Sequence, residues 1–215
     1  MELTPRRPVP VFPLPGLVVF PHVVVPLHVF ELRYRTMVRD ALSGERMLAL
    51  ALLKPGWEPE YHDRPEFHPL GCLARFEEVE WLPNDCYDLK LRVLARVELG
   101  RAAREFPYRA VRAIVRPQAP CGEDDPLVLS ERQPLLALYR LLAGEGAPEN
   151  AGEGLPFEAL VNAVCMALPC GAAEKLALLE LDDLVARGRR ACEIAVRPAA
   201  KRRPPAPGPG GAPDN

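Results

Sequence analysis

The densest group of side chains that could bind a metal lies in one proline-rich stretch, KPGWEPEYHDRPEFHP. Two histidines and two acidic residues are crowded in its second half, namely His62, Asp63, Glu66 and His68. The histidines are six residues apart in an expected loop, and neither their spacing nor their setting matches a recurrent metal motif. We therefore interpret the group as solvated loop residues, and we predict neither a metal nor another cofactor.

Cysteine is the second residue type that could bind zinc or act as a nucleophile. The six cysteines are Cys72, Cys86, Cys121, Cys165, Cys170 and Cys192. None forms a C-x-x-C pair, and the four residues between Cys165 and Cys170 fall outside the usual zinc spacing. Cys72 or Cys165 paired with a histidine would make a nucleophile, but no local signature accompanies either. We interpret all six as reduced packing residues of a cytoplasmic protein.

The sequence also lacks the motifs of phosphate-binding loops and serine nucleophiles. A P-loop needs a glycine-lysine pair, and the sequence contains none. The two serines are Ser43, at an expected helix end, and Ser130, which with Gln133 fits a capping box. Neither lies in a nucleophile motif. We predict that this chain is not an enzyme.

The opening stretch VFPLPGLVVFPHVVVPLHVF, residues 11–30, is long and apolar enough to raise the question of a membrane span. Its prolines exclude one, because each removes a backbone donor and costs a helix roughly 3 kcal/mol. No small-residue cleavage site of an export signal follows. Val18, Phe20 and the alternating residues from Val23 to Val29 instead predict short buried strands, with a turn at residues 14–16 and a break or bulge at residues 21–22.

The next elements follow from hydrophobic periodicity. An apolar stripe predicts a helix of about three turns, because its members recur at helical spacing: Tyr34, Met37, Val38, Ala41 and Leu42. Residues 46–53 form a short apolar run typical of a buried strand. Residues 71–117 read as an antiparallel meander, with Leu89 to Leu99 alternating and a glycine-containing turn before the third strand.

The chain changes character after Pro117. Asp125 followed by proline predicts a helix start, with a disturbance at Pro134. A second helix ends before Pro169, and the segment after it forms one long helix or two, depending on a break at Asp182-Asp183. Residues 198–215 are expected to be disordered, and their cluster Lys201-Arg202-Arg203 to be solvated. Strands first and helices last predict an α+β fold, with the change of domain near residue 117.

Three segments carry a resemblance to a known family. VPVFPLPGLVVFP (9–21), PLHVFELRYRTM (26–37) and LGCLARFEEVEWLPNDCYDLKLRVLARVEL (70–99) resemble the N-terminal domain of the ATP-dependent Lon protease, and more closely the bacterial proteins built from that domain alone. The likeness covers roughly residues 8–195. Leu32 departs from a frequent proline, and Asn84-Asp85-Cys86 replaces the usual Asp-Gly turn.

The resemblance implies a fold and a function. The fold is a PUA-like β-pseudobarrel with one early helix over residues 1–117, then a helical subdomain over 118–197. The function is binding of unfolded or extended protein segments, in protein quality control beside a protease or chaperone. The family's ATPase and peptidase parts are absent from this sequence.

Six residues are candidate peptide contacts: Glu31, Arg33, Tyr34, Trp57, Tyr61 and Phe67. The first three lie in the family motif. They either line a peptide groove or form a partly buried ion pair beside a core tyrosine, and we favour the second alternative. The aromatic residues of the long loop either contact a partner or fold back onto the core.

RNA binding is the alternative function, because PUA-like folds elsewhere bind RNA. A basic sheet face built from Arg92, Arg96, Arg109 and Arg112 would support it. The formal net charge of −2 and the absence of a basic-aromatic run argue against it, so we expect neither nucleic acid nor membrane as a partner.

Overall fold

The computed structural model describes residues 3–61, 63–146, 148 and 150–197. His62 and the tail with Lys201-Arg202-Arg203 lie outside the described residues. The chain divides into two compact units. The first comprises the described residues of Met1–Pro13, Val19–Ala51 and His68–Ala119, and the second those of Leu14–Val18, Leu52–Phe67 and Pro120–Asn215.

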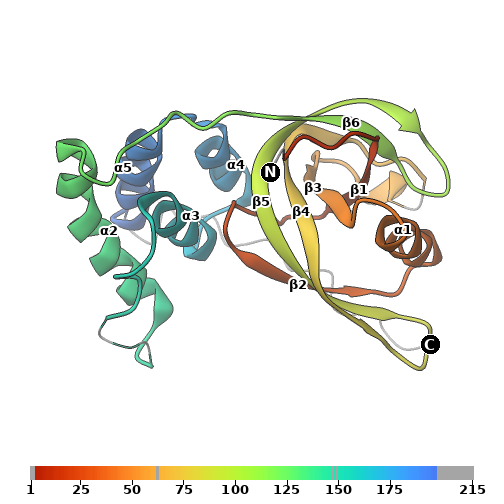
Figure 1. Ribbon diagram of the computed structural model, residues 1–215, viewed down its shortest axis with the longest axis horizontal. Helices are drawn as coiled ribbons and strands as arrows, with labels where there is room; N and C mark the ends of the chain where they lie inside the picture. Colours follow the sequence, from red (N-terminus) through yellow and green to blue (C-terminus); the bar gives the residue numbers. More distant parts are fainter. Residues whose placement is uncertain (1–2, 62, 147, 149, 198–215) are drawn as a thin grey trace. The chain divides into compact units, whose positions relative to one another are not determined.

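The described residues form one sheet of six strands (Figure 1). The strands are β1 (Val9–Leu14), β2 (Val24–Val29), β3 (Met47–Leu53), β4 (Phe67–Trp81), β5 (Tyr87–Arg104) and β6 (Ala110–Val115). Their order is β2-β5-β4-β3-β1-β6, and an additional pairing of β5 with β6 closes the last five into a ring. Strand β2 lies outside this ring, paired with the first part of β5.

The predicted antiparallel meander is confirmed, since β4 pairs antiparallel with β5 and β5 with β6. The predicted glycine turn is wrong. Gly100 lies inside β5, which continues to Arg104 before the chain turns into β6. Gly71 in β4 has a clear steric role, because a Cβ there would lie 2.5 Å from the carbonyl oxygen of Leu50 in β3.

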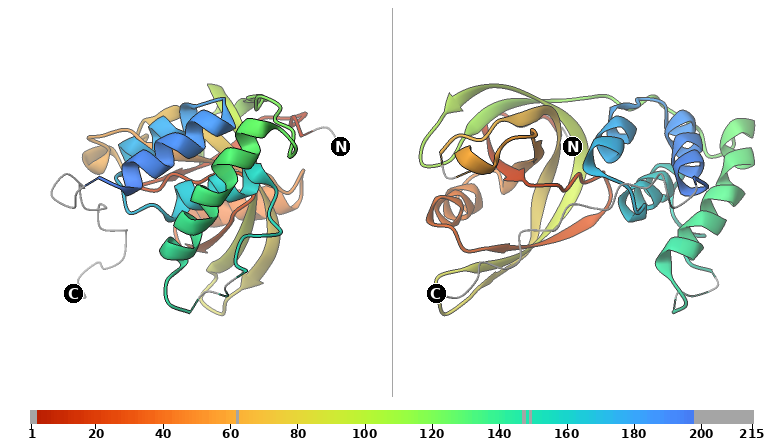
Figure 2. Two further views of the ribbon diagram at one scale, coloured as in Figure 1. Left: turned by 90° about the vertical axis from the view of Figure 1, so that its left-hand side faces the viewer. Right: turned by 180° about the vertical axis from the view of Figure 1, so that it is seen from behind.

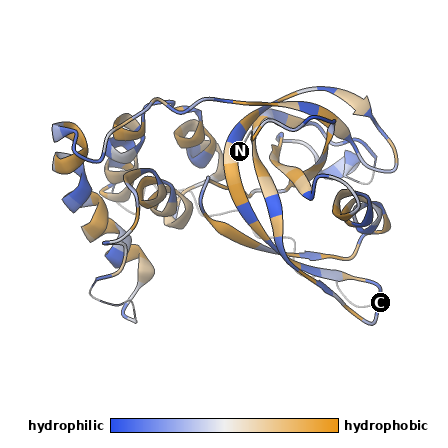
Figure 3. Cartoon of the chain, viewed as in Figure 1, coloured by the Kyte–Doolittle hydropathy of each residue, from blue (hydrophilic) through white to orange (hydrophobic). Residues whose placement is uncertain are grey.

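A β-bulge in β5 changes the predicted alternation. Leu73 of β4 pairs with Ala95, but the next residue, Ala74, pairs with Val93, so Leu94 has no partner in the ladder. The alternation is interrupted from Leu94 to Arg96 and then resumes, with Val97 and Leu99 buried and Glu98 exposed. Arg96, expected to point to solvent, is therefore 2% exposed and donates to the carbonyl oxygen of Pro117 at 3.0 Å. The ribbon of the sheet shows the interleaved hydrophobic and hydrophilic residues (Figure 3).

The helix of the first unit forms as its periodicity predicts. Helix α1 spans Leu32–Leu42, and its buried residues are Tyr34, Met37, Val38 and Ala41. The ring of Tyr34 lies 4.6 Å from that of Phe12 in β1, measured between centroids. Each large apolar side chain buried in this way contributes roughly 1.5–3 kcal/mol.

The opening run contains fewer strand residues than predicted. Val18 and Phe20 are buried but lie in no strand, and β2 begins only at Val24. Proline at position 21 cannot donate to a ladder. Gly16 adopts a positive φ of 71° at the predicted turn, and His22 one of 70° at the predicted break before β2.

The second unit consists mainly of helices. They are the 3-10 helix η1 (Glu58–Glu60) and the α-helices α2 (Pro126–Ala143), α3 (Phe157–Ala167), α4 (Ala172–Glu180) and α5 (Leu184–Ala195). Helix α2 packs against α3 and α5, and α3 also contacts α5 (Figure 2). In the part of the chain that the structure describes, no helix combines the length and the apolarity needed to cross a membrane.

Side-chain caps define two of these helices. The Asp125 carboxylate accepts from the backbone N–H of Leu127 at 2.8 Å, and Pro126 opens α2 as predicted. The Asp183 carboxylate accepts from Ala186 at 3.0 Å, so the last segment forms two helices. The capping box predicted for Ser130 is wrong, because this residue lies inside α2 and its hydroxyl donates to the carbonyl of Leu127.

Candidate functional site

One face of helix α1 meets the tip of the β4–β5 hairpin, and we call this region the α1–hairpin junction. Its helical residues recur at positions i, i+3, i+4 and i+7 and therefore share one side of α1: Leu32, Arg35, Thr36 and Arg39. This side is distinct from the buried stripe of the helix. The hairpin contributes Trp81, at the end of β4, and Asp85 in the turn.

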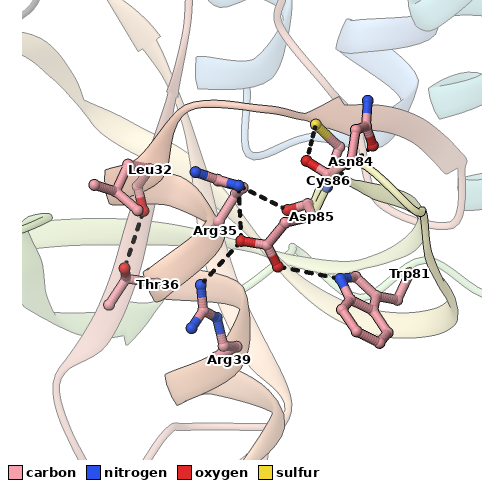
Figure 4. A network of polar contacts seen from close by, with 8 residues as sticks. All are labelled: Leu32, Arg35, Thr36, Arg39, Trp81, Asn84, Asp85 and Cys86. Carbon is pink, nitrogen blue, oxygen red and sulfur yellow. Dashed lines mark hydrogen bonds and ion pairs between the residues drawn. The ribbon is translucent and has the colours of Figure 1, made fainter.

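Asp85 is the centre of the polar contacts at this junction (Figure 4). Nη1 of Arg35 donates to the Asp85 carboxylate at 2.7 Å and to its backbone carbonyl at 3.1 Å. Arg39 lies 3.6 Å from the same carboxylate, and the indole N–H of Trp81 donates to its other oxygen at 3.2 Å. Asp85 has a positive φ of 63°, which a short polar side chain tolerates. The turn is thus held against α1.

Large apolar side chains are exposed around this network. Phe30 is 60% exposed, Leu32 65% and Trp81 69%. Trp and Arg are the residue types most enriched among the side chains that dominate binding energy at protein interfaces. The junction presents both types, fixed by hydrogen bonds, with aliphatic and aromatic surface around them. The junction thus combines exposed apolar surface with hydrogen-bond donors held in place.

The three predicted motif residues lie next to the junction. Arg33 lies 2.9 Å from the Glu31 carboxylate, and both side chains are 17% exposed. The Arg33 guanidinium also lies 4.6 Å from the centroid of the Tyr34 ring. Tyr34 is 4% exposed, and burial raises the pKa of its phenol to about 12. The structure therefore contains the partly buried pair and the core tyrosine, while a role in peptide binding stays a prediction.

The three predicted loop aromatics belong to the second unit. Trp57 and Tyr61 flank η1 and are half-buried, with ring centroids 5.3 Å apart in an edge-to-face arrangement. Phe67 is also half-buried and begins β4. The edge-to-face contact between Trp57 and Tyr61 stabilises the loop locally. Their use as peptide contacts stays a prediction, and they do not share a unit with Glu31, Arg33 and Tyr34.

The cysteines predicted as possible nucleophiles are inaccessible. Cys165 is fully buried, and burial raises the pKa of its thiol to about 12, whereas catalysis requires the thiolate. Cys72 is also fully buried, and its thiol donates to the carbonyl oxygen of Val19 at 3.3 Å. Among the described residues, no three or more His, Cys, Asp or Glu side chains gather closely enough to hold a metal ion.

The predicted arginine face does not form as expected. Arg96 is buried by the bulge in β5, and Arg92 is paired with Glu77 at 2.6 Å. Beside them, Lys90 is paired with Glu78 at 2.7 Å and Asp88 lies opposite Glu80 in the ladder. Carboxylates interleaved with the cations in this way oppose an approaching phosphate backbone.

The sequence carried one unused signal for the junction. Leu32 is an apolar residue on the side of α1 away from the buried stripe, where a polar residue is expected. Trp81 and Asp85 had no such signal, because their contact with α1 joins residues far apart in the chain. They are the candidate site residues that sequence reasoning missed.

The chain is similar to a known protein family in sequence and to solved structures in fold. Residues 8–197 match the family described as the ATP-dependent protease La (LON) substrate-binding domain. The fold is similar to the N-terminal domain of the Mycobacterium avium complex Lon protease, with a TM-score of 0.67 and 21% identity over 88% of this chain and 98% of that one. A Lon N-terminal domain protein from Xanthomonas campestris gives a TM-score of 0.65 and 22% identity over 89% and 99%.

Curated relatives match over part of their length. A Lon protease of Chloroflexus aurantiacus is 34% identical over 50% of this chain and 13% of its own length. Lon protease 2 of Herpetosiphon aurantiacus is 27% identical over 84% of this chain and 23% of its own length. This chain thus spans less than a quarter of either relative.

Proposed function

This chain belongs to the LON substrate-binding domain family, and on that premise we propose that it is a non-enzymatic module that binds unfolded or extended protein segments at the α1–hairpin junction. The observation that carries the proposal is the exposure of Leu32 and Trp81 on either side of the Arg35–Asp85 contact. Burying these two side chains under a partner removes their apolar surface from water, which favours association.

The mode of binding follows from what the junction offers. An extended segment would place apolar side chains against Leu32, Trp81 and the neighbouring Phe30. Arg39, whose side chain is 53% exposed, would donate hydrogen bonds to its backbone carbonyls. Backbone carbonyls occur in every sequence, and an unfolded chain exposes both its carbonyls and many more of its apolar side chains than a folded one. Such a site therefore selects unfolded chains without reading one sequence.

A non-enzymatic role is supported by the chemistry of the nucleophile candidates. The hydroxyl of Ser43 donates to the carbonyl of Arg39 at the end of α1, and that of Ser130 is used inside α2. The Cys165 thiol is held in its neutral form by burial.

A place in cytoplasmic protein quality control, beside a protease or chaperone, belongs to the same proposal. The six free cysteines accord with a reducing compartment.

Fluorescence anisotropy tests the proposal. A fluorescein-labelled polypeptide kept unfolded by reduction and carboxymethylation is titrated with the protein at two salt concentrations, with and without competing RNA. We expect binding that tolerates salt and that RNA does not displace. Trp81→Ala should weaken it by about tenfold, in the range of a strong interface contact. Leu32→Ala should weaken it by less.

Leu141→Ala is the matched control, because Leu141 is 77% exposed on α2 and distant in sequence from the junction. It should leave the affinity unchanged. An equal loss in Leu141→Ala, or no binding of the unfolded polypeptide at all, overturns the proposal. Binding that falls steeply with salt and is displaced by RNA instead supports the nucleic-acid alternative.

A further inference from the structure

A pocket of about 520 Å³ lies at the C-terminal end of α1, within the first unit and separate from the junction. Its lining includes Asp40 of α1, Met47 at the start of β3, Arg104 at the end of β5, and Tyr108 from the β5–β6 connection. The volume is typical of sites that enclose small molecules or single side chains. Nothing in the proposed function uses this pocket.

Three side chains in the pocket are held in place by one another. The Tyr108 hydroxyl donates to Oδ2 of Asp40 at 2.5 Å, and Arg104 Nη1 lies 3.5 Å from the same oxygen. The Arg104 guanidinium is stacked 3.9 Å from the centroid of the Tyr108 ring. Tyr108 itself is only 3% exposed and forms a fixed base for the other two.

Hydrogen-bonding capacity remains on both charged groups. Both contacts to Asp40 use Oδ2, and no described residue donates to Oδ1. The Asp40 side chain is 47% exposed, so a ligand can reach it. Arg104 is 42% exposed and has further N–H groups besides the one that faces Asp40. The pocket thus presents a free acceptor beside free donors. A chemical group that donates one hydrogen bond and accepts another along the same edge would complement Asp40 and Arg104 together.

The charges and the walls of the pocket narrow the ligand further. Arg7 and Arg104 are balanced by Asp40 and Glu45, so the lining has no formal net charge that would favour an anion or a cation. The walls include the apolar residues Val9, Met47 and Ala110. A neutral polar group on a small apolar body satisfies all of these features.

We propose that this pocket binds a primary carboxamide attached to a small apolar body. The carboxamide N–H would donate to Oδ1 of Asp40, and its carbonyl oxygen would accept from Arg104. A trans peptide group fits poorly, because its N–H and C=O point in opposite directions. The carboxamide comes either from a glutamine or asparagine side chain of a polypeptide or from a free small molecule.

An NMR titration of the intact protein with isovaleramide tests this site without relying on the proposed function. The amide signals of residues 41–47 should shift, with saturable dependence on concentration. Three probes of similar size are compared: methyl isovalerate, N-methylisovaleramide and isovalerate. Each should bind about fivefold or more weakly, the loss expected for one missing hydrogen bond. N-acetylglutamine N-methylamide binding more tightly than isovaleramide would identify a polypeptide side chain as the source, and the reverse order a free molecule.

Variants locate the contacts. Arg104→Gln should weaken isovaleramide binding by about fivefold, and Tyr108→Phe should weaken it as well because Asp40 loses its fixed donor. Arg101→Gln makes the same change at an exposed arginine of β5 that does not line the pocket, and should have no effect. The proposal is overturned if ester and carboxamide bind equally, if the shifts lie elsewhere, or if Arg101→Gln matches Arg104→Gln.

Discussion

Arg35 and Asp85, fifty residues apart in the chain, are joined by two hydrogen bonds from one guanidinium nitrogen, to the carboxylate at 2.7 Å and to the backbone carbonyl at 3.1 Å. The contact fixes the hairpin turn to helix α1 and thereby sets the position of Trp81 beside it. The affinity of a partner that contacts Trp81 would therefore depend on the Arg35–Asp85 contact, even if the partner touches neither residue.

The strength of this contact can be measured by a double-mutant cycle. Arg35→Met and Asp85→Asn, alone and combined, should give a coupling free energy of about 1 kcal/mol, because the arginine is largely buried but the carboxylate is nearly half exposed. Asparagine is chosen because it tolerates the positive φ of this position. Urea denaturation of the four proteins provides the measurement. Purely additive effects would show that the contact contributes nothing to stability.

The close approach of β3 to Gly71 predicts a large effect of a small substitution. Gly71→Ala places a methyl group 2.5 Å from the Leu50 carbonyl oxygen, so strands β3 and β4 must separate. We expect a loss of about 1–3 kcal/mol in the free energy of unfolding. Gly122→Ala is the control, since a Cβ there meets no atom within 4 Å. Equal stability of both variants in urea would contradict the close approach.

The buried phenol of Tyr34 predicts an alkaline loss of stability. Burial raises its pKa from 10.0 to about 12, so the folded protein retains a proton that the unfolded chain releases. The stabilisation is complete below pH 10 and is lost as the pH rises to 12. Cys165 acts in the same direction between about pH 9 and 12. Unfolding free energies of the wild type and Tyr34→Phe across this range isolate the tyrosine, and the variant should show the shallower decline.

Cysteine accessibility predicts an order of alkylation. Cys165 is fully buried, whereas Cys121 and Cys192 are partly exposed. Iodoacetamide added to the native protein at pH 8 should modify Cys121 and Cys192 first and Cys165 only after denaturant is added. Peptide mass spectrometry reads out each site. Rapid native modification of Cys165 would reopen the possibility of a cysteine nucleophile.

The sequence predicted the elements whose signals are local. The stripe of Tyr34, Met37, Val38 and Ala41 defined α1, because helical periodicity depends only on neighbouring residues. Likewise, the carboxylates of Asp125 and Asp183 cap their helices by accepting from backbone N–H groups two and three residues later in the chain. The family motif indicated the sheet and its order of elements. These parts required no knowledge of what lies across the fold.

The failures come from pairing between distant residues. The bulge at Leu94 arises from the register with β4, and a strand read alone gives no sign of it. Trp81 pairs with Tyr87 in the ladder, yet Tyr87 is buried and Trp81 is 69% exposed, a difference that the two residue types do not reveal. The region of the candidate site combines a local motif with contacts between distant residues. The motif residues Glu31, Arg33 and Tyr34 were therefore singled out from the sequence, whereas Trp81 and Asp85 were not.

The ring of strands has a consequence for synthesis on the ribosome. Val9 pairs with Val111, and β2 pairs with the first part of β5, so the first two strands emerge long before their partners. Until β6 has left the exit tunnel, the nascent chain carries unpaired apolar strands at its N-terminus. Such segments fold late and are prone to aggregation. The sheet can therefore close only after residue 115 has emerged from the tunnel, and ribosome stalling before that point should leave β1 sensitive to protease.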